Sequence, residues 1–242
     1  MEKKGSLAVV FLVVVIDLLG FGLILPLLPR YAQALNADKF TIGVLTGVFS
    51  LMQFLVSPLW GQLSDRIGRR PVLLLGLAGS TLFYALFAYG TYVGSLPLLF
   101  LSRIGAGIAG ATIGTAHAYI ADVTPPEKRT GGMALVGAAF GIGFTFGPLL
   151  GALALINQPS DSPTVSHWPG VWAAGLSFAA LVLALFRLPE SRQPGGPARA
   201  RKLSAENLRH VLATPLIPAL ILAFFAATLA FSQFESTLSL VL

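Results

Sequence analysis

The sequence predicts an all-α protein that crosses a membrane about seven times. Of its 242 residues, 55% are hydrophobic and 11% are charged, whereas a soluble domain carries about 25% charged residues. Apolar runs recur along the whole chain, and each approaches the roughly 20 residues that a spanning helix needs. Because the sequence contains no cysteine, it offers no disulfide framework and no thiol-based metal site.

Seven segments satisfy this length criterion. The first begins at Leu7 and has no small-residue cleavage site, which indicates a retained helix and not a removed signal peptide. We expect the spans at residues 7–28, 41–60, 72–92, 96–120, 131–156, 168–188 and 215–242.

The basic residues indicate the orientation of these spans. If the amino terminus is cytoplasmic, thirteen of the sixteen lysines and arginines lie on the cytoplasmic side. The outer loops then contain Arg30 and Lys39, and Arg103 lies inside a span. We therefore predict a multi-pass protein of the plasma (inner) membrane with a cytoplasmic amino terminus. Its net charge of +6 then faces the lipid bilayer and not nucleic acid.

The connection at 189–214 differs from the other connections because it is long, basic and rich in proline and glycine. It predicts a boundary between residues 1–188, a bundle of six transmembrane helices, and residues 215–242, the first helix of a second bundle. Because no polar tail follows the last span, we expect the chain to be truncated.

Three fully charged residues lie inside predicted spans, namely Asp17, Arg103 and Glu235. Uncompensated charge is costly in hydrocarbon, so such residues are functional candidates. His117, near the inner end of the fourth span, is a weaker candidate because its side chain can reach the interface.

Polar and small residues recur at helical spacing near these charges. They form one stripe in each of three spans: Thr46, Ser50, Gln53 and Ser57; Arg103, Gly107, Gly110, Gly114 and His117; and Thr228, Ser232, Glu235 and Ser239. The stripes predict a water-filled cavity between the first, second, fourth and seventh helices, where Asp17 or Glu235 could exchange a proton. The alternative is that the small residues only mark contacts between helices.

The connection between the second and third spans carries a short charged stretch over residues 61–73. Its arginines could serve only to set topology, or the stretch could be a gating turn. The second interpretation also explains Asp65 and a further acid, Asp122, on the same side of the membrane. The candidate gating residues are Gly61, Asp65, Arg66, Gly68, Arg69, Arg70 and Asp122.

The fifth span contains glycines at intervals of four residues. Gly143, Gly147 and Gly151 predict a flat strip for close helix packing. Pro148 removes one backbone hydrogen bond and should kink or soften the helix there.

These motifs resemble those of the major facilitator superfamily. Residues 61–70, Gly-Gln-Leu-Ser-Asp-Arg-Ile-Gly-Arg-Arg, match its motif A. The segment of the fourth span from Arg103 to Gly110 resembles motif B but departs from it at Ile104-Gly105. The strip from Gly143 to Gly151 is similar to motif C of the antiporters. The segment from Asp17 to Pro26 resembles the first helix of the drug:proton antiporters, and the tetracycline-efflux-like branch is the most similar.

The resemblance implies a rocker-switch transporter with two six-helix bundles, of which this chain carries the amino-terminal bundle and the first helix of the second. It implies that Asp17 is a proton- or substrate-binding carboxylate and that Arg103 modulates it. It also implies that Asp65, Arg69 and Asp122 form a charge cluster that grips a helix of the second bundle, a part missing from this chain.

We therefore predict proton-coupled efflux of small organic molecules or drugs by alternating access. The sequence shows no catalytic triad, phosphate-binding loop or metal cluster, so we expect no enzyme and no cofactor, and a proton gradient as the energy source. Two alternatives stay open. One is a proton symporter or facilitator of the same fold, against which motif C argues, and the other is a truncated membrane fragment that does not transport.

Overall fold

The computed structural model describes residues 2–156, 166–192, 213–214, 216–227 and 230 of the chain. It divides the chain into two compact units, Met1–Gly196 and Pro197–Leu242. The first unit contains six helical segments that are long and apolar enough to cross a membrane. In the second unit, the described residues include one shorter apolar helix, Ile217–Ala227. The remainder of the predicted seventh span, including Glu235, lies outside the described residues.

The elements of the first unit follow one another as long helices with short interruptions. Their order along the chain is α1 (Glu2–Ile24), η1 (Leu25–Leu27), α2 (Leu28–Ala34), α3 (Lys39–Ile67), α4 (Arg69–Tyr92), α5 (Leu96–Gly110), α6 (Ile113–Val123), η2 (Pro126–Lys128), α7 (Arg129–Leu155) and α8 (Trp168–Arg187).

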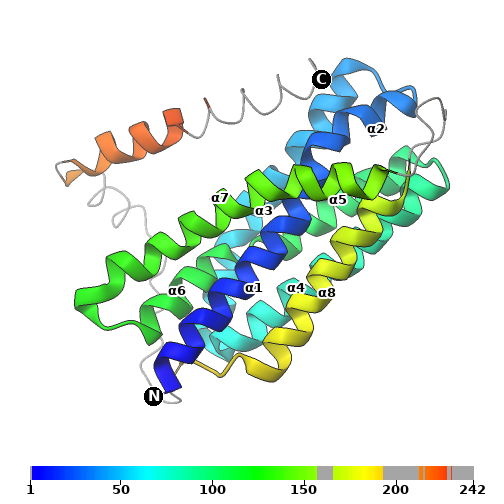
Figure 1. Cartoon of the computed structure of the whole chain (residues 1–242). Helices are drawn as coiled ribbons and strands as arrows, with labels where there is room; N and C mark the ends of the chain where they lie inside the picture. Colours follow the sequence, from blue (N-terminus) through cyan, green and yellow to red (C-terminus); the bar gives the residue numbers. More distant parts are fainter. Residues whose placement is uncertain (1, 157–165, 193–212, 215, 228–229, 231–242) are drawn as a thin grey trace. The chain divides into compact units, whose positions relative to one another are not determined.

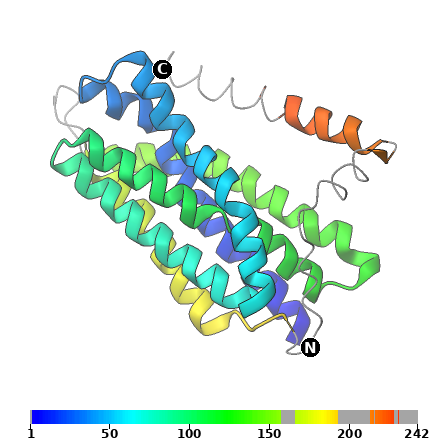
Figure 2. The ribbon, with the colours of Figure 1, turned by 180° about the vertical axis from the view of Figure 1, so that it is seen from behind.

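The helices of this unit pack in a defined order (Figure 1). Helix α1 lies along both α7 and α8, α8 also packs on α4, and α4 packs on α5. Seen from behind, α3 completes the arrangement by packing on α5 (Figure 2). In this order α7 and α3 lie at the two ends, and α1, α8, α4 and α5 lie between them.

The first predicted span is longer than expected. It continues through η1 and α2 to Ala34, so most of the predicted connection at 29–40 is helical. Pro26 and Pro29 are the second residues of η1 and α2, within the first turn, where a missing backbone N–H is tolerated. These prolines interrupt the helix without ending it. Asp38 then caps α3 by accepting a hydrogen bond from the Thr41 N–H at 3.0 Å, which holds the pKa of Asp38 below its usual value.

The charged stretch at 61–73 is also more helical than predicted. Helix α3 continues to Ile67 and α4 begins at Arg69, so Gly68 alone separates them. Gly68 has a φ of +107°, a conformation that only glycine adopts readily. The turn is therefore a single-residue hinge point between two helices, and its charged side chains project from helical turns.

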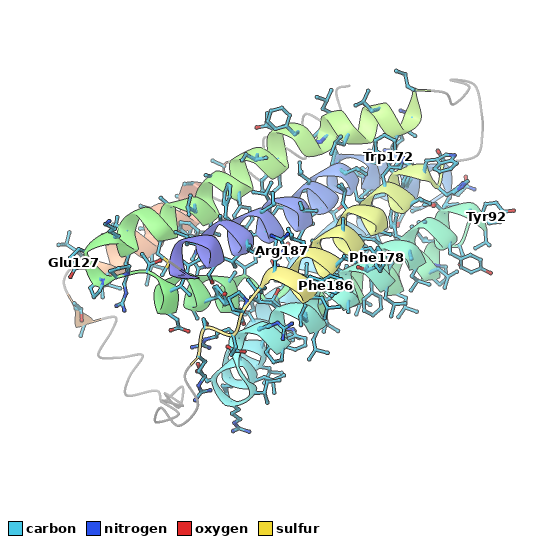
Figure 3. The ribbon with its side chains drawn as sticks, turned by 60° about the horizontal axis from the view of Figure 1, so that its bottom comes forward. Tyr92, Glu127, Trp172, Phe178, Phe186 and Arg187 are labelled. Carbon is cyan, nitrogen blue, oxygen red and sulfur yellow. The ribbon has the colours of Figure 1, made fainter. Side chains whose placement is uncertain are left out.

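The outer face of α8 is apolar along its length. Trp172, Phe178 and Phe186 are exposed on it, and Arg187 ends the helix (Figure 3). Tyr92, at the end of the neighbouring helix α4, is 71% exposed. A surface of this composition matches the hydrocarbon region of a bilayer, with aromatic residues toward one interface and a cation at the other.

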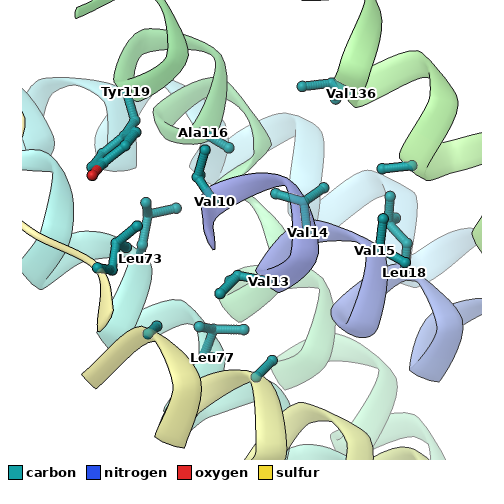
Figure 4. Packing of buried hydrophobic residues seen from close by; sticks show 14 of the residues in the cluster. Val10, Val13, Val14, Val15, Leu18, Leu73, Leu77, Ala116, Tyr119 and Val136 are labelled. Atoms are coloured by element: carbon teal, nitrogen blue, oxygen red, sulfur yellow. The ribbon is translucent and has the colours of Figure 1, made fainter. Parts of the chain in front are cut away.

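Two apolar clusters fill the interior of the unit. One surrounds the first half of α1, where Val10, Val13 and Val14 lie between residues of α4, α6 and α7 (Figure 4). The other surrounds its second half and includes Leu23, Tyr84 and Phe87. Arg103 lies against three aromatic residues of this second cluster, Phe49, Tyr84 and Phe87.

Candidate functional site

Arg103 on α5 is the most deeply buried charge in the described part of the chain. Its side chain is 1% exposed, and no carboxylate of the described residues lies within 4 Å of it. Its guanidinium carbon lies 5.4–5.7 Å from the centres of three aromatic rings, those of Phe49, Tyr84 and Phe87. Because arginine stays ionised in proteins, these rings supply the favourable electrostatic environment that a carboxylate would otherwise provide.

Two nitrogens of Arg103 have no hydrogen-bond acceptor. Nε and one terminal nitrogen are shielded from solvent and unpaired among the described residues. A buried donor without an acceptor costs stability. The arrangement therefore keeps a positive charge inside the membrane unit at an energetic cost, which is characteristic of functional sites.

Asp17 on α1 faces α4 and α8. The Ser177 hydroxyl of α8 donates a hydrogen bond to Oδ1 of Asp17 at 3.0 Å, and Ser80 of α4 is a second hydroxyl neighbour. Both serines are buried. No basic side chain of the described residues lies within 4 Å of Asp17, so this carboxyl group is held by hydroxyl donors alone.

Tyr84 lies between these two opposite charges. Its ring is one of the three around Arg103, and its edge faces Gly20, one helical turn from Asp17. Tyr84 therefore contacts Arg103 on one side and the turn of α1 next to Asp17 on the other. The sequence interpretation did not single out Tyr84, and nothing in the sequence distinguishes it from Tyr89 and Tyr92 in the same predicted span.

The small residues of the fourth span form a contact surface with α3. A β-carbon at Gly107 would lie 3.0 Å from Met52, and one at Gly110 would lie 3.4 Å from Phe49. The stripe that starts at Arg103 thus mediates close helix packing, as the alternative interpretation held. The structure does not place Asp17 on this surface, since its carboxyl group faces α4 and α8.

The fourth span is also broken, where a continuous helix was predicted. Helix α5 ends at Gly110 and α6 begins at Ile113. Two side chains of α3 donate to carbonyl oxygens at this break: Gln53 Nε2 to Gly110 at 2.9 Å and Trp60 Nε1 to Ile108 at 2.6 Å. Gln53 therefore has a structural partner in the protein itself. His117 lies beyond the break on α6 and is half-buried.

The motif end of the unit, where α3 meets α4, contains a network centred on Arg69. Its NH1 atom lies 2.6 Å from Asp65 Oδ1, and its Nε atom lies 3.4 Å from Asp122 Oδ2. The same NH1 donates to the Ser64 hydroxyl at 2.6 Å. The two acids predicted to belong together are thus joined through one guanidinium group. Gly61 lies within α3, and Arg66 lies exposed in its last turn.

Glu190 completes this network and was missed at the level of sequence. It accepts hydrogen bonds from the backbone N–H groups of Arg69 at 2.9 Å, Arg70 at 3.1 Å and Arg192 at 3.0 Å. The carboxylate thus caps the amino terminus of α4, where the helix dipole favours negative charge. Its only sequence signal was an acid directly after Pro189, in a stretch interpreted as linker.

The glycine strip of the fifth span packs directly on α1. A β-carbon at Gly143 would lie 2.8 Å from that of Leu18, and one at Gly147 would lie 2.5 Å from the carbonyl carbon of Gly22. At Gly151 it would lie 2.9 Å from the Leu23 carbonyl oxygen. The predicted close packing is confirmed, and Pro148 lies within α7 as predicted.

Comparisons with known proteins agree on a single family. The model of the Major Facilitator Superfamily matches residues 10–242. Tetracycline resistance protein, class C, of Escherichia coli is 38% identical over 236 residues, which are 93% of this chain and 56% of that protein. The chain therefore spans about half the length of this curated relative.

Two solved structures have the same fold. The human organic anion transporter MFSD10 (TETRAN) is 32% identical with a TM-score of 0.65, over 79% of this chain and 49% of that one. A bacterial homologue of the human lysosomal transporter Spinster, in an inward-facing and unoccupied conformation, has a TM-score of 0.65 at 16% identity. That match covers 87% of this chain and 49% of the other.

Proposed function

Since this chain belongs to the Major Facilitator Superfamily, a family of membrane transporters and not of enzymes, we propose that it is part of a proton-coupled efflux antiporter. Its substrates would be small organic molecules or drugs, and alternating access would move them. The chain corresponds to about half the length of its relatives. The activity we propose is therefore that of a transporter with two bundles.

One observation carries this proposal: Asp17 and Arg103 lie within the spans of the same membrane unit, and neither forms an ion pair with any described residue. Asp17 is held by the Ser177 hydroxyl and Arg103 by aromatic rings. An acid with only neutral donors around it can release and regain a proton without breaking an ion pair. The ring of Tyr84 contacts Arg103 and its edge faces Gly20, one helical turn from Asp17, so Tyr84 would couple the protonation state of Asp17 to Arg103.

The relatives support the choice of substrate class. Tetracycline resistance proteins and an organic anion transporter are both similar to this chain. Tetracyclines and organic anions share an organic body with ionisable groups. We propose a substrate of this kind, bound near Arg103, with Gln53, His117 and Glu235 as further candidate contacts.

The motif end would control access. We propose that residues 1–188 form the first bundle, that 189–214 form a cytoplasmic linker and that 215–242 begin the second bundle. The protein would lie in the plasma (inner) membrane with its amino terminus on the cytoplasmic side. The cluster of Asp65, Arg69 and Asp122 would then grip the second bundle in one state of the cycle. The glycine strip on α7 would keep that helix seated on α1 while the bundles tilt.

The test is transport in inverted membrane vesicles that contain the complete two-bundle transporter. We expect an imposed proton gradient to drive tetracycline accumulation, and Asp17→Asn to abolish it while membrane insertion is retained. Asp38→Asn is the matched control, because it removes a carboxylate from an exposed helix cap that asparagine serves equally well. Unchanged proton-driven accumulation in Asp17→Asn would refute the proton-carrier role. Movement of substrate with the proton, and not against it, would indicate a symporter.

A further inference from the structure

The acidic residues at the motif end pair with only one of its arginines among the described residues. Asp65 and Asp122 both pair with Arg69, and Asp122 also accepts a hydrogen bond from Ser191. Glu190 is occupied by backbone N–H groups. Each acid of the network therefore already has partners, and Arg69 is the one arginine side chain that forms ion pairs with them among the described residues.

Three other arginines, all near the junction of α4 and α8, lack a carboxylate partner. Among the described residues, no carboxylate oxygen lies within 4 Å of the side chains of Arg70, Arg187 or Arg192. We call these three residues the arginine patch. Two of them come from the carboxyl end of α8 and the segment that follows it, and the third from the first turn of α4. Arg70 is joined to the last turns of α8 because its NH2 donates to the Leu185 carbonyl at 2.7 Å.

The patch has hydrogen-bond donors without acceptors. Nε of Arg70 and NH1 of Arg192 are shielded from solvent and unpaired among the described residues. Guanidinium N–H groups without acceptors, near other cations, form a site that attracts an oxyanion. Phosphate fits such a site well, because its oxygens can accept the paired N–H donors of arginine.

The position of the patch identifies the source of that phosphate. The outer face of α8 is apolar up to Phe186, which is 77% exposed, and Arg187 follows directly (Figure 3). A helix of 20 residues spans about 30 Å, the thickness of the hydrocarbon core. Arg187 therefore lies at the level of the lipid headgroups, with an exposed apolar surface beside it for acyl chains.

We propose that Arg70, Arg187 and Arg192 form a binding site for the phosphate of an anionic phospholipid whose acyl chains lie along the outer face of α8. The site is separate from Asp17 and Arg103 and does not depend on transport. It would anchor the junction of α4 and α8, where Glu190 already caps α4.

The experiment measures lipid binding to the purified chain in detergent. Phosphatidylglycerol, phosphatidylcholine and soluble glycerol phosphate are titrated separately, with thermal unfolding and retained lipid in native mass spectrometry as readouts. We expect phosphatidylglycerol to bind and to raise the unfolding midpoint, and the other two to have little effect. The double variant Arg187→Gln/Arg192→Gln should bind phosphatidylglycerol about thirtyfold more weakly, because each arginine near a lipid surface contributes about a fivefold factor.

Arg129→Gln is the matched control, because it removes one exposed cation from the start of α7, an element that contributes no residue to the arginine patch. It should keep the binding of the unsubstituted chain. Equal binding of phosphatidylcholine, or unchanged phosphatidylglycerol binding in the double variant, would overturn the proposal. An equal response to glycerol phosphate would overturn the lipid assignment and indicate a site for free phosphate. If the double variant fails to fold, Arg187→Gln alone, at an exposed position, gives the same comparison with an expected fivefold loss.

Discussion

The two charged regions of the six-span unit are built in opposite ways. At the motif end, Arg69 contacts both Asp65 and Asp122, and Glu190 is saturated with backbone donors. Within the spans, Asp17 and Arg103 form no ion pair with any described residue. Opposite charges are brought together where water is near and kept apart where it is scarce.

The two regions should therefore contribute differently to stability and to function. Partly exposed pairs cost little desolvation energy and can hold helix ends in place. An unpaired buried charge lowers stability, so its retention needs a functional reason. Substitutions at the motif end should therefore alter the stability of the six-span unit in addition to gating, and substitutions within the spans should alter transport with little loss of stability.

The largest expected effect is at Arg103. In the complete transporter, Arg103→Leu should reduce transport at least about a hundredfold, which corresponds to roughly 3 kcal/mol of lost interaction. Its thermal stability should stay equal or rise, because two buried donors without acceptors are removed. Vesicle transport and the unfolding midpoint in detergent measure the two effects. Arg103→Lys, which retains the charge, should keep more activity than Arg103→Leu. Normal transport together with a lowered unfolding midpoint in Arg103→Leu would mean that Arg103 serves stability and not transport.

Next in size is the hinge point at Gly68. Gly68→Ala should lower the free energy of unfolding by about 1–3 kcal/mol, because φ is +107° and a β-carbon would collide with the Glu190 carboxylate. Thermal unfolding of the purified chain measures this loss. Gly61→Ala is the control: it lies in α3 with nothing within 4 Å of the added carbon and should be neutral or stabilising. Equal losses in both variants would mean that backbone geometry at Gly68 is not the cause.

Removing the cap of α4 should have an intermediate effect. Glu190→Ala leaves the N–H groups of Arg69 and Arg70 without their acceptor and should cost about 1 kcal/mol. For a unit of this size the unfolding midpoint should fall by about 2–4 °C. Glu127→Ala, an exposed acid at the same end of the unit, should change the midpoint by less than about 1 °C. A larger loss in the control would contradict the capping role.

The smallest effect is expected at Asp122. Its carboxylate lies 3.4 Å from Arg69 Nε, and the Asp122 side chain is 34% exposed. Asp122→Asn should therefore lower the free energy of unfolding by less than about 1 kcal/mol. That cost should shrink further at high salt, because screening weakens exposed pairs. Unfolding measured at 50 mM and 500 mM salt tests this prediction. A large loss of stability that does not change with salt would mean that Asp122 behaves as a buried charge, and the two charged regions would then not differ in this respect.

Much of the fold could be predicted from the sequence because each span depends on local composition. Six predicted spans and the family resemblance are confirmed. The boundaries were less predictable. The stretch at 61–73 was interpreted as a turn because it is charged, yet helix continues on both sides of Gly68. The break between α5 and α6 carries no proline, and its carbonyls are satisfied by Gln53 and Trp60 from another helix.

The sequence by itself determined which residues are unusual for a membrane: Asp17, Arg103, the charged stretch at 61–73 and the glycine strip of the fifth span. Length, hydropathy and spacing suffice for this, since each is a property of neighbours in the chain. Only the tertiary structure decided their partners. Asp17 meets Ser177 across 160 positions, and Glu190 meets Arg69 across 121. Such pairs arise from helix packing, which depends on how all the surfaces fit together and not on any single segment.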